Sequence, residues 1–322
     1  MFHVKTAIAA AVAAAVALPA AAQEVKLSAI NFIQNEHAFG QPLVEWSEMV
    51  NTAGKGVVQI EIKPYGAIPV FEMGNAVKGG VADLGSVPAT FFQNLLPIGE
   101  ATKLATRSAE EIRKNGGFAL LNQLFREKVN AELLSVHGQG TPFHLYLREK
   151  KIEKADLTGL KLRVTPIYRA FFRALGAQIV VIPPPEVLSA LERGTVDGYG
   201  WPIWDIKTVG WDKYTKYRVD PGFYVAAGNF FVNLNKWNSL SPKAREILAK
   251  TAEQYDLVEW TKRAVEKNKR YAKDQADAGV QVINLTGAEA AKYIKTSYDA
   301  GWAEHEQLDP ENAKKLKPLL SK

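Results

Sequence analysis

The sequence of 322 residues contains no cysteine. This absence excludes disulfide scaffolds, thiolate zinc sites, catalytic thiols and cysteine-ligated clusters. Four common motifs are also missing: the phosphate loop G-x-x-x-x-G-K-[ST], the dinucleotide motif G-x-G-x-x-G, the nucleophile elbow G-x-S-x-G and the zinc motif H-E-x-x-H. No two of the histidines after the N-terminal segment stand at metal-ligand spacing. The sequence therefore predicts no cofactor and no metal site.

The chain also lacks a concentration of charge of one sign. Its 40 Lys and Arg residues stand against 34 Asp and Glu, and the basic residues of this +6 chain are scattered among acidic ones. Without a basic patch carrying aromatic residues, no binding to nucleic acid is expected. After residue 22, no apolar run approaches the ~20 residues of a membrane-spanning helix. The length and the 47% hydrophobic content instead indicate about two globular domains.

The first 22 residues have the pattern of an export signal. Lys5 precedes an apolar stretch from Thr6 to Leu18, and Pro19 and three alanines follow. This order is typical of a secretory signal peptide, here cleaved before Gln23. A buried alanine-rich helix is the alternative interpretation, but it gives no reason for the small-residue end. We therefore expect a mature protein in the periplasm.

Short apolar strands alternate with helical segments along the mature chain. Strands are expected at 25–32, 57–66, 81–88, 133–149 and 179–183, with helices between them. Such alternation predicts an α/β fold with parallel strands and helices on both faces of the sheet.

Two stretches of the chain, 60–88 and 179–202, resemble each other. Each reads strand, proline turn, short helix, glycine, strand, proline; Gly80, Asp83 and Pro88 have the same mutual spacing as Gly194, Asp197 and Pro202. The alternative is that many helix-to-strand joints contain Gly and Asp. A duplication predicts two similar halves with a cleft between them. Ligands bind at the carboxyl ends of parallel strands, so residues 86–91 and 199–204 are expected to face each other across that cleft.

Residues 241–278 contain one proline, directly after Ser241, and no glycine. This favours one long helix bracing both halves, with two consecutive helices as the alternative. Ile247, Leu248, Thr251, Tyr255, Val258 and Val265 form its expected buried stripe. A strand at 280–286 and short helices are expected to follow.

Arg163 is the sharpest candidate for a ligand contact. It ends the apolar strand 159–164, where a guanidinium needs an anion or a ring of carbonyls. A structural ion pair with an internal carboxylate is the alternative. Trp201 and Trp204 flank Pro202, where a flat side chain either covers a ligand or fills a hinge.

The runs KADLTGLKLRV (154–164) and ALGAQIVVIPPPEVLSALERGTVDG (174–198), with AVKGGVADLGSVPATFF (76–92) and FFVNLNKWNSLSP (230–242), resemble a known family. They are similar to the extracytoplasmic solute-binding proteins of tripartite ATP-independent periplasmic (TRAP) transporters, the DctP-type family. The resemblance implies a two-domain periplasmic binding protein fold with a central ligand cleft and a long helix spanning both domains. It also implies capture of an organic acid, which passes to the membrane permease subunits of a sodium-driven TRAP transporter.

The same resemblance assigns roles to individual residues. It makes Arg163 the carboxylate clamp, Trp201 a contact in the second lip, and His144 the counterpart of a second arginine in some relatives. Members with tryptophan there often carry a glutamate directly before it and some bind a metal ion, so Gly200 argues against a metal. The remaining expected contacts are Asn31, Ser86, Phe91 and Tyr168. Phe91 stands where some sialic-acid binders have arginine, so the expected ligand is a monocarboxylate with an apolar or aromatic body.

The expected domain I comprises residues 23–139 plus about 228–265, and domain II about 140–227 plus 266–322. Hinges are expected near 138–142 and 224–230. The competing function is a secreted hydrolase or lyase acting on a small carboxylate, for which His144 near Arg163 is the one plausible general base.

Overall fold

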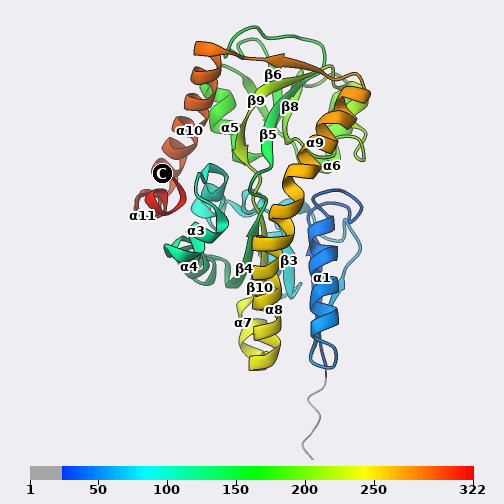
Figure 1. Ribbon diagram of the computed structural model, residues 1–322, viewed down its shortest axis with the longest axis vertical. Coiled ribbons are helices and arrows are strands. Elements are labelled where there is room, and N and C mark those ends of the chain that lie inside the picture. Colours follow the sequence, from blue (N-terminus) through cyan, green and yellow to red (C-terminus); the bar gives the residue numbers. More distant parts are fainter. Residues whose placement is uncertain (1–23) are drawn as a thin grey trace, which may run out of the picture.

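The computed structural model describes residues 24–322, and the expected signal peptide lies outside these residues. Figure 1 shows two halves, one above the other, with a long helix running beside both. Each half has its own β-sheet. The chain crosses from the lower to the upper sheet between β4 and β5, and it returns between β9 and β10. This is the α/β, two-domain architecture that the sequence predicts.

The lower half in Figure 1 contains a five-stranded sheet in the order β2-β1-β3-β10-β4. β1 is parallel to β2 and β3, whereas β10 is antiparallel to its neighbours β3 and β4. Its strands are β1 (Val25–Asn31), β2 (Val58–Ile62), β3 (Leu84–Ser86), β4 (Ala131–His137) and β10 (Gly228–Asn233). The helices of this part of the chain are α1 (Gln41–Ala53), α2 (Met73–Lys78), α3 (Ala109–Lys114), α4 (Gly117–Leu124) and α7 (Leu234–Ser239), with short helices η1 (Val70–Glu72), η2 (Ala89–Phe92), η3 (Pro97–Leu104) and η4 (Phe125–Val129).

The upper half contains a six-stranded sheet in the order β11-β9-β5-β8-β6-β7. Its strands are β5 (Pro142–Leu147), β6 (Lys161–Val164), β7 (Gln178–Val181), β8 (Gly198–Pro202), β9 (Tyr217–Val225) and β11 (Gln281–Asn284). The helices here are α5 (Pro166–Ala174), α6 (Pro184–Glu192) and η5 (Trp211–Tyr214). β5 is the antiparallel strand between β8 and β9, which makes it the counterpart of β10 in the other sheet.

The internal similarity of the sequence corresponds to a repeated topology. The order β2-β1-β3-β10 matches β7-β6-β8-β5, with three parallel strands and one antiparallel strand in each half. Gly80 and Gly194 both have positive φ, 77° and 65°, which glycine adopts without strain. Asp83 and Asp197 each accept a hydrogen bond from a backbone N–H of the neighbouring parallel strand. The shared spacing therefore marks the same turn built twice.

The long helix is continuous from Pro242 to Asp277, but it is not a plain α-helix. It consists of α8 (Pro242–Gln254), the π-helical segment η6 (Tyr255–Trp260) and α9 (Thr261–Asp277). The wider π turn rotates the residues that follow it relative to the preceding face. The prediction that Val258 and Val265 belong to the buried stripe is therefore wrong, since these residues are 36% and 60% exposed. Asp256, Trp260 and Ala264 are buried in their place.

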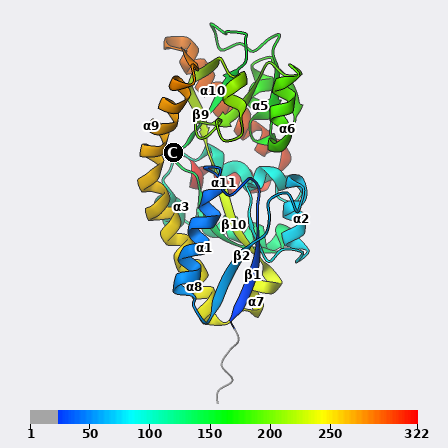
Figure 2. The ribbon, with the colours of Figure 1, turned by 90° about the vertical axis from the view of Figure 1, so that its right-hand side faces the viewer.

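This helix is anchored in both halves, as Figure 2 also shows. On the lower half, the Trp46 indole N–H donates to Thr251 Oγ1 at 3.0 Å. On the upper half, Gln275 Nε2 donates to the carbonyl of Ile203 at 2.8 Å. One continuous helix thus contacts both halves.

The C-terminal helices differ from the expected short ones. α10 (Gly287–Leu308) has 22 residues and contains Gly301. A Cβ at Gly301 would lie 2.8 Å from side-chain atoms of Leu104 and Tyr224, so this glycine permits close packing instead of ending the helix. α11 (Pro310–Leu320) returns to the lower half, where the Leu320 carbonyl accepts from the N–H groups of Thr106 and Arg107. We therefore propose that domain II ends before α11.

Within residues 24–322, no helix combines the length and the apolar character needed to cross a membrane.

Candidate functional site

A cavity lies between the two halves, at the carboxyl ends of β1, β3, β6 and β8 and beside the two crossing segments. The space between its walls is about 580 Å³, part of it open to solvent. The walls are mostly apolar, with hydroxyl groups and one imidazole among them. They are formed by Phe32, Phe39, Ser86, Pro88, Thr90, Phe91, His137, Phe143, Thr165, Ile167, Trp201, Pro202, Ala226, Ala227 and Gly228.

Three of the residues expected from the sequence line this cavity: Ser86 and Phe91 from the lower half, and Trp201 from the upper half. Phe91 packs against Phe32, with ring centroids 5.6 Å apart. Trp201 is 5% exposed, and its indole N–H donates to the carbonyl of Trp204 at 3.1 Å. The two expected lips therefore do face each other across one space.

Arg163 is fully buried and does not itself line the cavity. Its Nε donates to the Ile182 carbonyl at 2.8 Å and its Nη1 to the Tyr168 hydroxyl at 2.8 Å, while Nη2 has no partner. The guanidinium carbon lies 5.8 Å from the ring centroid of the cavity residue Trp201. Within residues 24–322 no carboxylate pairs with Arg163, so a structural ion pair, the alternative in the sequence analysis, is not present.

Burial lowers the pKa of Arg163, with the Tyr168 hydroxyl opposing this effect. A buried cation without an anion is costly, because its desolvation is not offset by a nearby negative charge. The two N–H groups on Nη2 are thus a preformed donor for an incoming anion. Nη2 is sealed from solvent in this structure, and the ring centroids of Trp201 and Trp211 lie 5.8 Å and 5.7 Å from the guanidinium carbon.

Tyr168 holds Arg163 rather than lining the cavity. Its hydroxyl donates to the Gly200 carbonyl at 2.5 Å and accepts from Arg163. Its ring occupies the space next to Gly200, where a Cβ would lie 2.5 Å from Tyr168 Cε2. Any side chain at position 200 would therefore displace the tyrosine, which explains why glycine stands directly before Trp201.

Asn31, at the end of β1, is buried and holds a loop. Its Nδ2 donates to the Gly40 carbonyl at 2.9 Å and to Asn35 Oδ1 at 3.0 Å. Asn31 Oδ1 has no partner. Asn31 thus shapes the segment 35–40, which meets the upper half, and it is not one of the cavity walls.

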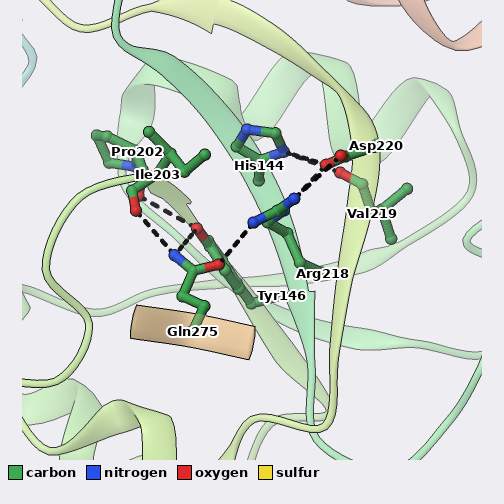
Figure 3. A network of polar contacts seen from close by, with 8 residues as sticks. All are labelled: His144, Tyr146, Pro202, Ile203, Arg218, Val219, Asp220 and Gln275. Carbon is green, nitrogen blue, oxygen red and sulfur yellow. Dashed lines mark hydrogen bonds and ion pairs between the residues drawn. The ribbon is translucent and has the colours of Figure 1, made fainter. Parts of the chain in front are cut away.

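The structure places His144 away from the cavity, in the polar network of Figure 3. Its Nδ1 lies 2.9 Å from Asp220 Oδ1, and Asp220 also accepts two hydrogen bonds from Arg218. Burial alone would raise the pKa of Asp220, but the bonds from His144 and Arg218 lower it to about 2. Gln275 links Arg218 to the end of β8. The strand β8 separates β5, which carries His144, from β6, which carries Arg163, so the two side chains are not brought together.

His37 and Asp205 join the two halves, and the sequence analysis did not single out either residue. The His37 Nε2 lies 3.1 Å from the Asp205 carbonyl oxygen, and its Nδ1 accepts from the Phe39 N–H at 3.0 Å. Asp205 Oδ2 accepts from the Ala38 N–H at 2.9 Å. His37 is therefore neutral, with its proton on Nε2. The signal available in the sequence was the polar group Asn35, Glu36 and His37, which follows the first strand.

This contact predicts a pH dependence. Burial lowers the pKa of His37 to about 4 from 6.5, with the charge of Asp205 partly opposing the shift. The unfolded chain takes up the proton more readily, so stability falls as pH drops from about 6.5 towards 4, by roughly 2 kcal/mol or more. We expect the melting temperature of His37→Gln to fall less between pH 7 and pH 4.5 than that of the wild type. An equal drop in both proteins would contradict this role.

No group of three His, Asp or Glu side chains within residues 24–322 is arranged to hold a metal ion.

Residues 31–306 match the family model described as bacterial extracellular solute-binding protein, family 7 (DctP). The chain belongs to this family. The match includes every strand of both sheets except β1, of which it covers only Asn31, as well as both crossing segments and all the cavity residues. The family consists of binding receptors, in agreement with a cleft between two domains.

Individual relatives of this DctP-family chain are distant in sequence. It is 25% identical over 209 residues to a monocarboxylate 2-oxoacid-binding periplasmic protein of Nostoc, covering 60% of this chain and 56% of the relative. The match thus spans little more than half the length of that curated protein.

Two solved structures show the same fold. A TRAP periplasmic solute-binding protein from Desulfovibrio salexigens with bound orotic acid has a TM-score of 0.82 and 20% identity, covering 92% of this chain and 97% of that one. The Bordetella pertussis receptor DctP7, which binds pyroglutamic acid, has a TM-score of 0.80 and 16% identity, covering 92% and 99%.

Proposed function

We propose that this protein captures an organic acid in the cavity between its two halves and delivers it to a TRAP-type transporter. The observation that carries this proposal is the buried guanidinium of Arg163, which has a free Nη2 and no carboxylate partner among the described residues. A ligand carboxylate placed there would gain charge-assisted hydrogen bonds and neutralise the buried cation. The membership in the DctP family supports the same function.

The cavity walls indicate the chemical character of the part of the acid that is not the carboxylate. Phe32, Phe91 and Phe143 line the cavity, and its polar side chains are few. An aromatic or branched apolar group would bury its surface against these rings, whereas a polyhydroxylated chain would lose hydrogen bonds to water. We therefore propose a monocarboxylate with an apolar or aromatic body. The names of the Nostoc and Desulfovibrio relatives, which contain a 2-oxoacid and orotic acid, agree with a carboxylate.

The expected partners and location follow from the family and from the first residues. Family membership supports an extracytoplasmic receptor. The sequence of residues 1–22 supports export through a cleavable signal peptide and a periplasmic location. Delivery to permease subunits of a TRAP transporter is part of the proposal.

A secreted hydrolase or lyase is the competing function, and its candidate base does not reach the site. His144 lies outside the cavity and is separated from Arg163 by β8. Its Nδ1 is already engaged by Asp220 and the Val219 carbonyl. A receptor would return its ligand unchanged after long incubation, whereas an enzyme would convert it.

A thermal-shift screen against small carboxylic acids tests the proposal. A bound acid at about 100 times its dissociation constant adds roughly 2.7 kcal/mol to the stability of the folded state. We expect aromatic and branched monocarboxylates to raise the melting temperature, and their uncharged amides to leave it unchanged. If the amides match the acids, or if no acid in the library has an effect, the carboxylate-receptor function is wrong.

A further inference from the structure

His137 is the one imidazole in the cavity wall, and a chain of polar groups stands behind it. It is the last residue of β4, where the chain crosses to the upper half. Its ring packs against Phe230 and Trp260, at centroid distances of 4.4 Å and 5.3 Å, so its orientation is fixed. The proposed function assigns no role to this residue.

The polar chain begins at Asp256 on the π-helical segment η6. Asp256 Oδ2 accepts from Arg113 Nη2 at 2.6 Å and from the Val136 N–H at 3.2 Å, and its Oδ1 accepts from the Ser135 hydroxyl. Burial raises the pKa of Asp256 to about 6 against the opposing effect of Arg113. The carboxyl group is therefore ionised at pH 7. An ionised carboxylate only accepts hydrogen bonds, so the single hydroxyl proton of Ser135 is donated to it.

The position of that proton fixes the tautomer of His137. Ser135 Oγ lies 3.0 Å from His137 Nδ1. Since the hydroxyl proton is committed to Asp256, Nδ1 must carry a proton and donate it to Ser135 Oγ. Burial lowers the pKa of His137 to about 3, so the ring is neutral at pH 7. Its Nε2 then has a free lone pair.

The free nitrogen lies at the edge of the ring that faces Gly228. A Cβ at Gly228, another cavity residue, would lie 2.3 Å from His137 Nε2, so only glycine leaves this edge of the ring uncovered. None of the described residues donates a hydrogen bond to Nε2. The buried atoms without a partner include Nε2 of His144 but not that of His137, which keeps contact with open space. The Thr90 hydroxyl in the same cavity wall also lacks a partner.

We propose that His137 Nε2 accepts a hydrogen bond from the bound acid, so that the site prefers carboxylates that carry a hydroxyl or N–H group on their body. This inference rests on the proposed function and adds a second recognition point to Arg163. A ligand with only a carbonyl oxygen at that place would bring an acceptor against the acceptor His137 Nε2, and no hydrogen bond would form between them. Ser135 and Asp256 act as positioning residues, because they fix which nitrogen of the ring is free.

The tautomer is tested without any ligand, by nitrogen NMR of the full mature chain labelled at histidine. The His137 signals, assigned by their loss in His137→Phe, are expected to show a protonated Nδ1 and an unprotonated Nε2. Ser135→Ala removes the acceptor for Nδ1–H and is expected to shift this pattern towards the other tautomer. A proton on Nε2 in the wild-type protein would overturn the proposal.

Recognition is tested by calorimetric titration with three aromatic acids of the same size: mandelate, phenylglyoxylate and phenylacetate. Mandelate offers a hydroxyl, phenylglyoxylate a carbonyl, and phenylacetate neither. We expect mandelate to bind wild type most tightly, and His137→Phe to lose about 10-fold in mandelate affinity with little change for phenylacetate. His305→Phe, which replaces another buried imidazole outside the cavity, should keep the wild-type ratio.

The outcomes separate this inference from the proposed function. If mandelate and phenylacetate bind wild type equally, or if His137→Phe weakens both alike, the role of His137 is wrong while the carboxylate receptor stands. If none of the acids in the thermal-shift screen binds, both are overturned.

Discussion

Replacing Arg163 with alanine is expected to weaken binding of a carboxylate by roughly 30-fold to several thousand-fold, the range seen when one member of a buried charge pair is removed. The ligand carboxylate would still be desolvated in the cleft, but it would find no cation there. The remaining groups around it, the Tyr168 hydroxyl and the Gly200 carbonyl, would then hydrogen-bond only to each other.

The charge and the geometry of Arg163 can be separated by further substitutions. Arg163→Lys keeps the charge but cannot contact the Ile182 carbonyl and Tyr168 while still offering a free nitrogen, so an intermediate loss is expected. Arg163→Met removes a buried cation and fills similar space. We expect it to abolish tight binding while the melting temperature without ligand stays equal to that of the wild type or rises.

The measurements are calorimetric titration with the strongest acid from the screen and a melting curve of the free protein. Arg173→Met is a suitable control, because Arg173 lies exposed on α5, outside the cavity wall, and should leave the affinity unchanged. Normal binding by Arg163→Ala, or unfolding of Arg163→Met, would show that the arginine is a structural residue.

Much of the fold was accessible from the sequence because it depends on local signals. The proline after Ser241 predicts the start of the long helix, and the Ser241 side chain does accept from the Ala244 N–H. Alternating apolar strands and the repeated Gly and Asp positions predict two similar sheets. The π-helical segment η6 has no comparable local signal, and its Asp256 hydrogen-bonds to Arg113 and Ser135 in distant parts of the chain.

The sequence predicts only part of the site, because several of its contacts join distant parts of the chain. The lips containing Ser86, Phe91 and Trp201 follow from strand ends, which the sequence marks clearly. His144 was expected only from the family resemblance, and its partner in the structure, Asp220, lies on β9, a strand paired with β5. His137 ends β4, where the chain first crosses to the upper half, and its proposed role depends on Ser135 and Asp256 behind it.

A methyl group at Gly200 is expected to impair both stability and binding. The Cβ of Gly200→Ala would lie 2.5 Å from Tyr168 Cε2 and 2.7 Å from Cζ. The tyrosine ring is itself buried against Phe143 and Phe172, so it cannot turn away without disturbing the core. Overpacking of this kind costs about 1 to 3 kcal/mol. Because the Tyr168 hydroxyl would move with the ring, Arg163 would lose a partner, and we expect the ligand affinity to fall at least about 10-fold.

A double-mutant cycle identifies the cause of this effect. Tyr168→Ala makes room for the methyl group, so adding Gly200→Ala to it should cost much less stability than adding it to wild type. Gly79→Ala is the matched control, because Gly79 has an ordinary φ of −84° and its Cβ would meet only the Asn75 carbonyl, at 3.3 Å. Stability is measured by denaturant unfolding and affinity by calorimetry. If the costs of Gly200→Ala and Tyr168→Ala simply add, the methyl group does not act through the tyrosine. In that case, the contact of Tyr168 with Arg163 would not explain why position 200 is a glycine.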